Sequence, residues 1–104
     1  MTECIDAWTH ILPRQYFARL QTIGSASGRM KRWLTLKSLY DLDERFRLMD
    51  QFPDYRQFLT PSLPPVEDLA EGQAANDLAC LMNDELDALV TAHPDRFAGW
   101  CGAV

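Results

Sequence analysis

Short apolar segments alternate with longer amphipathic segments along the 104-residue chain. Residues 3–8 are mostly apolar and lead into the polar pair Thr9 and His10, which predicts a buried strand with polar residues at its carboxyl end. Pro13 suits the first turn of a helix, and the apolar residues of segment 13–21 recur at helical spacing. The pattern therefore predicts a strand followed directly by a short amphipathic helix.

A second helix is predicted over residues 41–51. Asp41 can cap its first turn, and Glu44 stands three positions further on, as in a capping box. Leu42, Phe46 and Met49 fall on one face, and we expect Arg45 and Arg47 to lie off that face.

The remaining segments vary in how clearly their patterns can be interpreted. Glycine and serine in segment 24–28 indicate a loop, whereas segment 29–38 fits a strand, a helical turn or an irregular lid. Residues 55–60 predict a second strand, which a stiff proline-rich loop follows. An apolar stripe in segment 66–92 predicts the longest helix, and segment 97–104 predicts a third strand.

The order of these elements predicts one α/β domain over residues 1–104. Strands that alternate with helices favour parallel pairing, and right-handed crossovers place the helices on one side of the sheet. About three parallel strands fit either a doubly wound sheet or an incomplete (β/α)₈ barrel. No GxGxxG motif follows the first strand, which weakens the dinucleotide-binding option. Because the third strand reaches the last residue, we expect further chain to complete the sheet.

Composition and charge exclude several classes of protein. A hydrophobic fraction of 47% and a charged fraction of 24% are typical of a folded globular protein. A formal net charge of -5 argues against nucleic-acid binding. The basic cluster Arg29, Lys31 and Arg32, with Lys37 nearby, is interpreted as a solvated surface, with an anion-binding loop as the alternative. No apolar stretch reaches ~20 residues, so no membrane association is expected.

Three cysteines, Cys4, Cys80 and Cys101, stand far apart and form no CxxC pair. An odd, scattered set argues against a disulfide framework and for a reducing compartment. Their neighbours are apolar, so we expect them to pack as small hydrophobic residues. The chain starts without a basic, then apolar leader, which agrees with a cytoplasmic location.

The end of the first strand is the strongest candidate for chemistry. Side chains two positions apart on a strand point to the same face, so Trp8 and His10 are expected to lie together. His10 can bind a metal or serve only as a hydrogen-bonding residue, whereas an indole cannot bind a metal. His93, before Pro94 at a helix end, is interpreted as structural.

Residues 5–13, with the sequence IDAWTHILP, resemble the first-strand signature I-D-x-H-x-H-x-x-P of the amidohydrolase-related family that includes aminocarboxymuconate-semialdehyde decarboxylase. Segments 43–50, 83–86 and 93–99 are similar to the same family in order and spacing. The resemblance implies a metal-dependent (β/α)₈ barrel, usually with zinc, that decarboxylates or hydrolyses small, often aromatic, carboxylic acids.

Carried over residue by residue, the resemblance makes His10 a metal ligand and places Trp8 at the position of the second ligand. Trp8 is then expected either to stack on an aromatic carboxylate substrate or to fill space in a non-catalytic relative. A catalytic zinc needs about three protein ligands, so this chain alone is not expected to hold one tightly or to be active. The acid and base residues are expected to lie outside these 104 residues.

A second hypothesis from another class stays open. A short α/β protein without catalysis could act through self-association or by binding a partner, and copies of the chain could complete a sheet together as a homo-oligomer. Concentration-dependent stability would mark such an assembly.

Overall fold

The computed structural model of the chain describes residues 3–22, 35–62, 66 and 69–102. Three strands make one sheet, in the order β1-β2-β3: β1 (Cys4–Ile11), β2 (Tyr55–Pro61) and β3 (Phe97–Trp100). Both neighbouring pairs are parallel. The predicted α/β class with three parallel strands is therefore confirmed.

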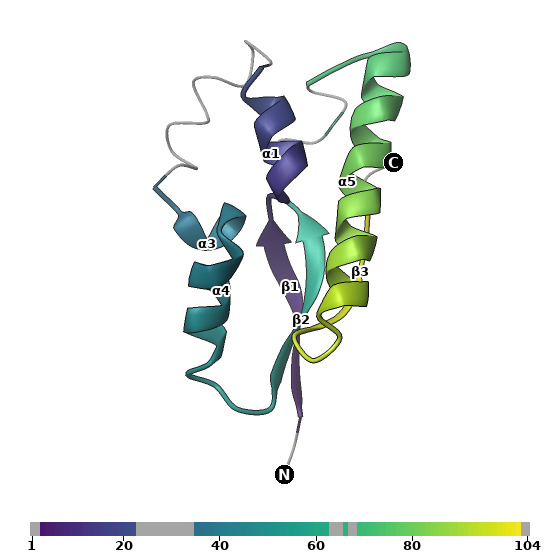
Figure 1. Cartoon of the computed structure of the whole chain (residues 1–104). Helices are drawn as coiled ribbons and strands as arrows, with labels where there is room; N and C mark the ends of the chain where they lie inside the picture. The colour runs from purple at the N-terminus through teal and green to yellow at the C-terminus, as the bar shows by residue number, and fades with distance from the viewer. Residues whose placement is uncertain (1–2, 23–34, 63–65, 67–68, 103–104) are drawn as a thin grey trace.

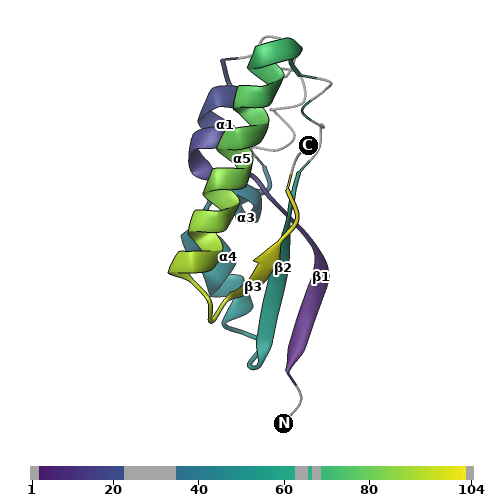
Figure 2. The ribbon, with the colours of Figure 1, turned by 90° about the vertical axis from the view of Figure 1, so that its right-hand side faces the viewer.

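Four helices are described: α1 (Arg14–Leu20), α3 (Lys37–Tyr40), α4 (Leu42–Met49) and α5 (Gly72–Ala92). They gather on one face of the sheet, as predicted, and among the described elements none covers the opposite face (Figure 1, Figure 2). We call that opposite side the open face. In the described ranges, no helix combines the length and the apolar character needed to cross a membrane.

The core lies between the helices and the sheet. Its largest fully buried side chains come from α1, α5, the strands and the turn after β1: Leu12, Tyr16, Leu20, Leu59, Met82, Leu86 and Phe97. The predicted stripe of α5 is confirmed, since its apolar residues face this core. Full burial of one such side chain stabilises the fold by about 1.5–3 kcal/mol.

Helix α4 begins where the sequence predicts. The Asp41 carboxylate accepts hydrogen bonds from the backbone N–H groups of Asp43 and Glu44, at 3.0 and 3.3 Å. The reciprocal half of the predicted capping box does not form, because Glu44 pairs with Arg47 at 2.6 Å and the Asp41 N–H donates to the Lys37 carbonyl. The cap therefore has one side chain rather than two.

Two predicted boundaries were wrong. Helix α5 begins at Gly72 rather than at residue 66, because Glu71 is extended and Gly72 has a φ of 59°, a left-handed conformation that interrupts a helix. Strand β3 ends at Trp100, and Cys101 and Gly102 are not in a strand. Residues 103–104 of the predicted strand lie outside the described part of the chain.

The expectation that β1 is a buried strand holds only for its helix-side face, where Thr9 and Ile11 are buried, and the expectation that the cysteines are buried was wrong. Ile5 and Trp8 are 49% and 75% exposed, because the open face has no helix over it. Cys4, Cys80 and Cys101 are exposed as well and none forms a disulfide. These thiols do not fill the core.

Candidate functional site

Strand β1 directs Trp8 and His10 to the open face near its carboxyl end. The alternating residues Thr9 and Ile11 are buried on the helix side, at 8% and 2% exposure. The Trp8 and His10 rings meet edge to face, with centroids 5.3 Å apart. The two candidate residues therefore lie together, as the sequence predicts.

An irregularity in the strand sets this placement. The β1–β2 register shifts between Asp6 and Thr9, and the Asp6 Oδ1 accepts a hydrogen bond from the Trp8 N–H at 3.0 Å. The other oxygen, Oδ2, accepts from the Tyr55 hydroxyl at 3.0 Å. The Asp6 carboxylate thus holds the bulge instead of facing a ligand.

Thr60 fixes the tautomer of His10. The Thr60 hydroxyl donates its single hydrogen to the Thr9 carbonyl at 2.6 Å, and its oxygen lies 3.0 Å from the His10 Nδ1. Because that hydrogen is already used, the Nδ1–H must donate to Thr60. The lone pair of the neutral ring then lies on Nε2, which is the arrangement of a histidine that binds a metal through Nε2 while its other nitrogen donates to a protein oxygen.

Arg45 secures the backbone at the same point, and the expectation that it lies off the buried face of the helix was wrong. The residue is only 5% exposed. Its Nη1 and Nη2 donate to the His10 carbonyl, both at 3.1 Å, and Nη1 also donates to the Ser38 carbonyl at 2.9 Å. Burial lowers the pKa of Arg45 to about 10, so the guanidinium stays charged at neutral pH. Arg47, by contrast, lies off that face as predicted, with its side chain 63% exposed.

Tyr55 and Gln57 connect the Asp6 carboxylate to the Arg45 guanidinium. Gln57 accepts from the Arg45 Nε at 2.8 Å and donates to the Tyr55 hydroxyl at 3.2 Å. Burial is the largest cause that raises the pKa of Tyr55. A continuous chain of hydrogen bonds therefore runs from Asp6 through Tyr55 and Gln57 to Arg45.

The donors present do not make up a zinc site. Within the described ranges, no group of three or more His, Cys, Asp or Glu side chains could hold a metal ion. His10 offers one nitrogen, and the neighbouring Trp8 indole offers no lone pair. A catalytic zinc takes about three protein ligands, so any further ligands would have to come from outside these ranges.

The other residues noted in the sequence lie elsewhere. Arg29, Lys31 and Arg32 fall outside the described residues, and Lys37 is exposed at the start of α3. His93 caps the end of α5, and its ring packs on Phe46 and Phe97 at centroid distances of 5.0 and 6.2 Å. These contacts agree with a structural role for His93.

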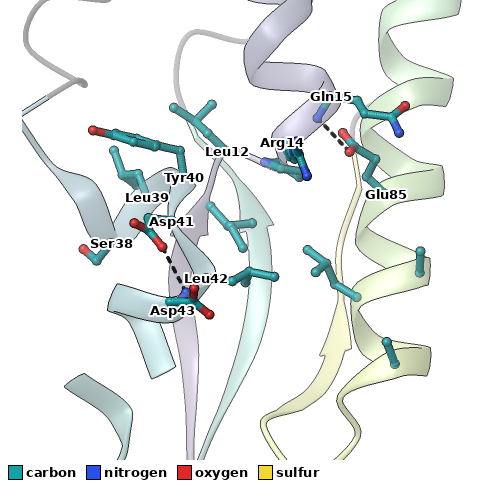
Figure 3. Close-up of a pocket in the computed structure, with 15 residues that line it drawn as sticks. Leu12, Arg14, Gln15, Ser38, Leu39, Tyr40, Asp41, Leu42, Asp43 and Glu85 are labelled. Carbon is teal, nitrogen blue, oxygen red and sulfur yellow. Dashed lines mark hydrogen bonds between the residues drawn. The ribbon is translucent and has the colours of Figure 1, made fainter. Parts of the chain in front are cut away.

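A cavity of about 660 Å³ lies in the helix layer, between the start of α1, the α3–α4 region and α5 (Figure 3). Two of its acidic side chains, Glu85 and Asp41, cap helices, and Asp43 is a third acidic residue in the lining. Glu85 accepts from the N–H groups of Gln15 and Tyr16 at 2.9 and 2.7 Å, and Asp41 caps α4. The rest of the lining is mainly apolar, apart from Arg14, Gln15, Ser38 and Asp43.

Compared with models of known protein families, the chain matches none. What the site can do therefore follows from its own geometry. His10 presents one oriented imidazole nitrogen, and Trp8 presents a flat apolar surface beside it, both on the open face.

Proposed function

We propose that this chain forms the N-terminal part of a metal-dependent (β/α)₈ barrel enzyme of the amidohydrolase-related type, a decarboxylase or hydrolase of small aromatic carboxylic acids. His10 binds the divalent metal, zinc by preference, and Trp8 packs against the substrate. The observation that carries the proposal is the oriented Nε2 of His10 on the open face, at the carboxyl end of β1. In barrel enzymes, the chemistry lies at the carboxyl ends of the strands.

The sheet itself gives further support. Strands of a parallel sheet normally have both faces covered, whereas the open face leaves Ile5 and Trp8 exposed. In a closed barrel, this face becomes the interior and the helices form the outer ring, which is the side on which they lie here (Figure 2). The described residues supply one metal ligand, so a working site requires ligands from later strands.

Zinc titration of two variants tests the role of His10. In Trp8→His, the new imidazole lies two positions from His10 on the same face, so this variant is expected to bind zinc more tightly than the parent chain. His10→Ala is expected to lose the zinc binding that the parent shows. Because thiolates also bind zinc, the series is measured in a background in which the exposed residues Cys4, Cys80 and Cys101 are serine. Equal zinc affinity in all members contradicts the proposal.

A second candidate function rests on the same exposed surface. Exposed apolar side chains such as Ile5 and Trp8 favour a short α/β protein without catalysis that associates with itself through the open face. Such an assembly dissociates on dilution without any dependence on zinc, which distinguishes it from the enzyme proposal.

A further inference from the structure

The Arg45 guanidinium is a buried cation whose hydrogen-bond partners are all neutral. Its acceptors are the carbonyls of His10 and Ser38 and the side-chain amide of Gln57. These bonds use four of the five N–H groups of an arginine, and the remaining one, on Nη2, has no acceptor among the described residues.

No carboxylate balances this charge in the described part of the chain. The ion pairs found there join Arg47 to Glu44, Arg56 to Glu3, and Arg96 to Asp50 and Asp95. Asp6 reaches Arg45 only through Tyr55 and Gln57, and its Oδ2 already accepts from the Tyr55 hydroxyl. Buried charges in proteins are usually paired, so an unbalanced guanidinium favours an anion beside it.

A cavity of about 480 Å³ lies against Arg45, between α4 and the sheet. Pockets for small molecules have volumes of roughly 300–1,000 Å³. Arg45, Tyr55 and Gln57 contribute polar groups to this cavity, whereas Leu48 and Phe52 contribute apolar walls and are 39% and 61% exposed. The two kinds of lining match a molecule with one anionic group and one apolar part.

We propose that this cavity binds a small organic carboxylate, whose oxygens accept from the Arg45 Nη2 while its apolar part packs against Leu48 and Phe52. Thr9 and His10 of β1 also line this cavity, whereas Trp8 does not. The carboxylate site goes beyond the proposed function because it requires neither a metal nor a completed barrel. A charge-assisted pair with arginine gives the site its preference for an anion.

The test is a titration of the purified chain with benzoate, monitored through backbone amide chemical shifts, with benzamide as the neutral analogue. We expect benzoate to bind at least about tenfold more tightly than benzamide, because the carboxylate adds a charge-assisted hydrogen bond. The largest shifts are expected at Leu48, Phe52 and Tyr55. Acetate, which lacks the apolar part, is expected to bind more weakly than benzoate.

Three variants make the result specific to the cavity. Arg45→Met is expected to abolish the preference for benzoate over benzamide. Phe52→Ala removes only an exposed wall, so it is expected to keep the fold and to weaken benzoate binding. Arg47→Gln, on the exposed side of the same helix, is the matched control and is expected to bind benzoate as the parent does.

Equal affinity for benzoate and benzamide overturns the proposal, as does loss of benzoate binding in Arg47→Gln with retention in Phe52→Ala. Should Arg45→Met fail to fold, the Phe52→Ala and Arg47→Gln pair still decides the outcome. Zinc affinity plays no part in this test, so its failure leaves the metal proposal for His10 unaffected.

Discussion

At the end of β1, single side chains determine where the backbone lies. Arg45 holds the His10 carbonyl from the helix side, and Thr60 orients the His10 ring on the open face. Arg45 also binds the Ser38 carbonyl and Gln57, so one residue ties α3, α4, β1 and β2 together. These residues fix the position of His10, and Arg45 also lines the cavity proposed to bind a carboxylate.

Replacing Arg45 tests this role through stability. Arg45→Ala removes a buried side chain and its donors to the part-buried carbonyls of His10 and Ser38, so it is expected to lower the free energy of unfolding by about 2–4 kcal/mol. Arg45→Lys keeps the charge but loses the planar fork, and it should recover only part of that loss. Urea unfolding measures the free energy of unfolding of both variants. The control Arg47→Gln removes an exposed pair and should change the free energy by at most about 0.5 kcal/mol. An equal effect of Arg45→Ala and Arg47→Gln would contradict this account.

Tyr16 gives the fold a dependence on alkaline pH. Burial raises its pKa to about 12, from an ordinary value of 10.0. The unfolded chain loses the phenol proton first, so the contribution of Tyr16 is complete below pH 10 and is lost as the pH rises toward 12. We expect the free energy of unfolding to fall by up to about 3 kcal/mol across this window.

Tyr16→Phe is the control for this effect, because it removes the titrating group while retaining the buried ring. Its free energy of unfolding should depend less on pH between 10 and 12 than that of the parent. Tyr55→Phe is a useful comparison, since the pKa of Tyr55 is also raised by burial. A Tyr16→Phe variant with the full alkaline loss would show that another group is responsible.

At the scale of elements, α5 organises the helix layer by capping its neighbour. Glu85, midway along α5, accepts from the Gln15 N–H at the start of α1 (Figure 3), and also from the Tyr16 N–H. The residue before α1 is Pro13, which provides no side-chain cap. The negative charge also complements the positive end of the helix dipole. Glu85 therefore caps the N-terminus of α1 from a distant part of the chain, whereas Asp41 caps the N-terminus of α4 from the adjacent position.

Glu85→Ala is expected to lower the free energy of unfolding by about 1–2 kcal/mol, because two backbone donors of α1 lose their acceptor. Glu85→Gln keeps one acceptor oxygen and should have a smaller effect. The exposed neighbour Asp84 provides the control, since Asp84→Ala should change stability by at most about 0.5 kcal/mol. Thermal or urea unfolding measures the stability of the three variants. No difference between Glu85→Ala and Asp84→Ala would remove the capping role.

The elements could be predicted from sequence to different degrees. Apolar periodicity was sufficient for the strands, for the order of elements and for the buried stripe of α5, because burial imposes that periodicity. It failed for Arg45, since an arginine is assigned to solvent unless its partners are known, and those partners are carbonyls 7 and 35 positions away. The Thr60–His10 contact depends on strand register, which the sequence does not specify.

On the scale of the whole molecule, the sheet has one packed face and one open face (Figure 2). Ile5 and Trp8 are the exposed large apolar residues of β1 on this sheet. Exposed apolar area of this kind promotes association, whether the natural cover is the rest of a barrel or a second copy of the chain.

Sedimentation over a range of concentrations tests that consequence. We expect the 104-residue chain to associate as its concentration rises, and Ile5→Ser with Trp8→Ser to weaken this association. Phe52→Ser is the control, because Phe52 is equally apolar and 61% exposed but follows α4 in the helix layer. A monomer at all concentrations, or a larger effect of Phe52→Ser, would contradict the role of the open face.

His10 is proposed to bind a metal within a barrel of which these strands are the first part. The most direct test is the zinc content of the protein expressed from the complete reading frame that encodes these residues, with His10→Ala beside it. We expect the frame to extend far enough to finish a barrel, roughly 150 residues or more. We also expect bound zinc in the parent protein and its loss in His10→Ala. A reading frame that stops at Val104, or zinc content that is the same in both proteins, would contradict the proposal.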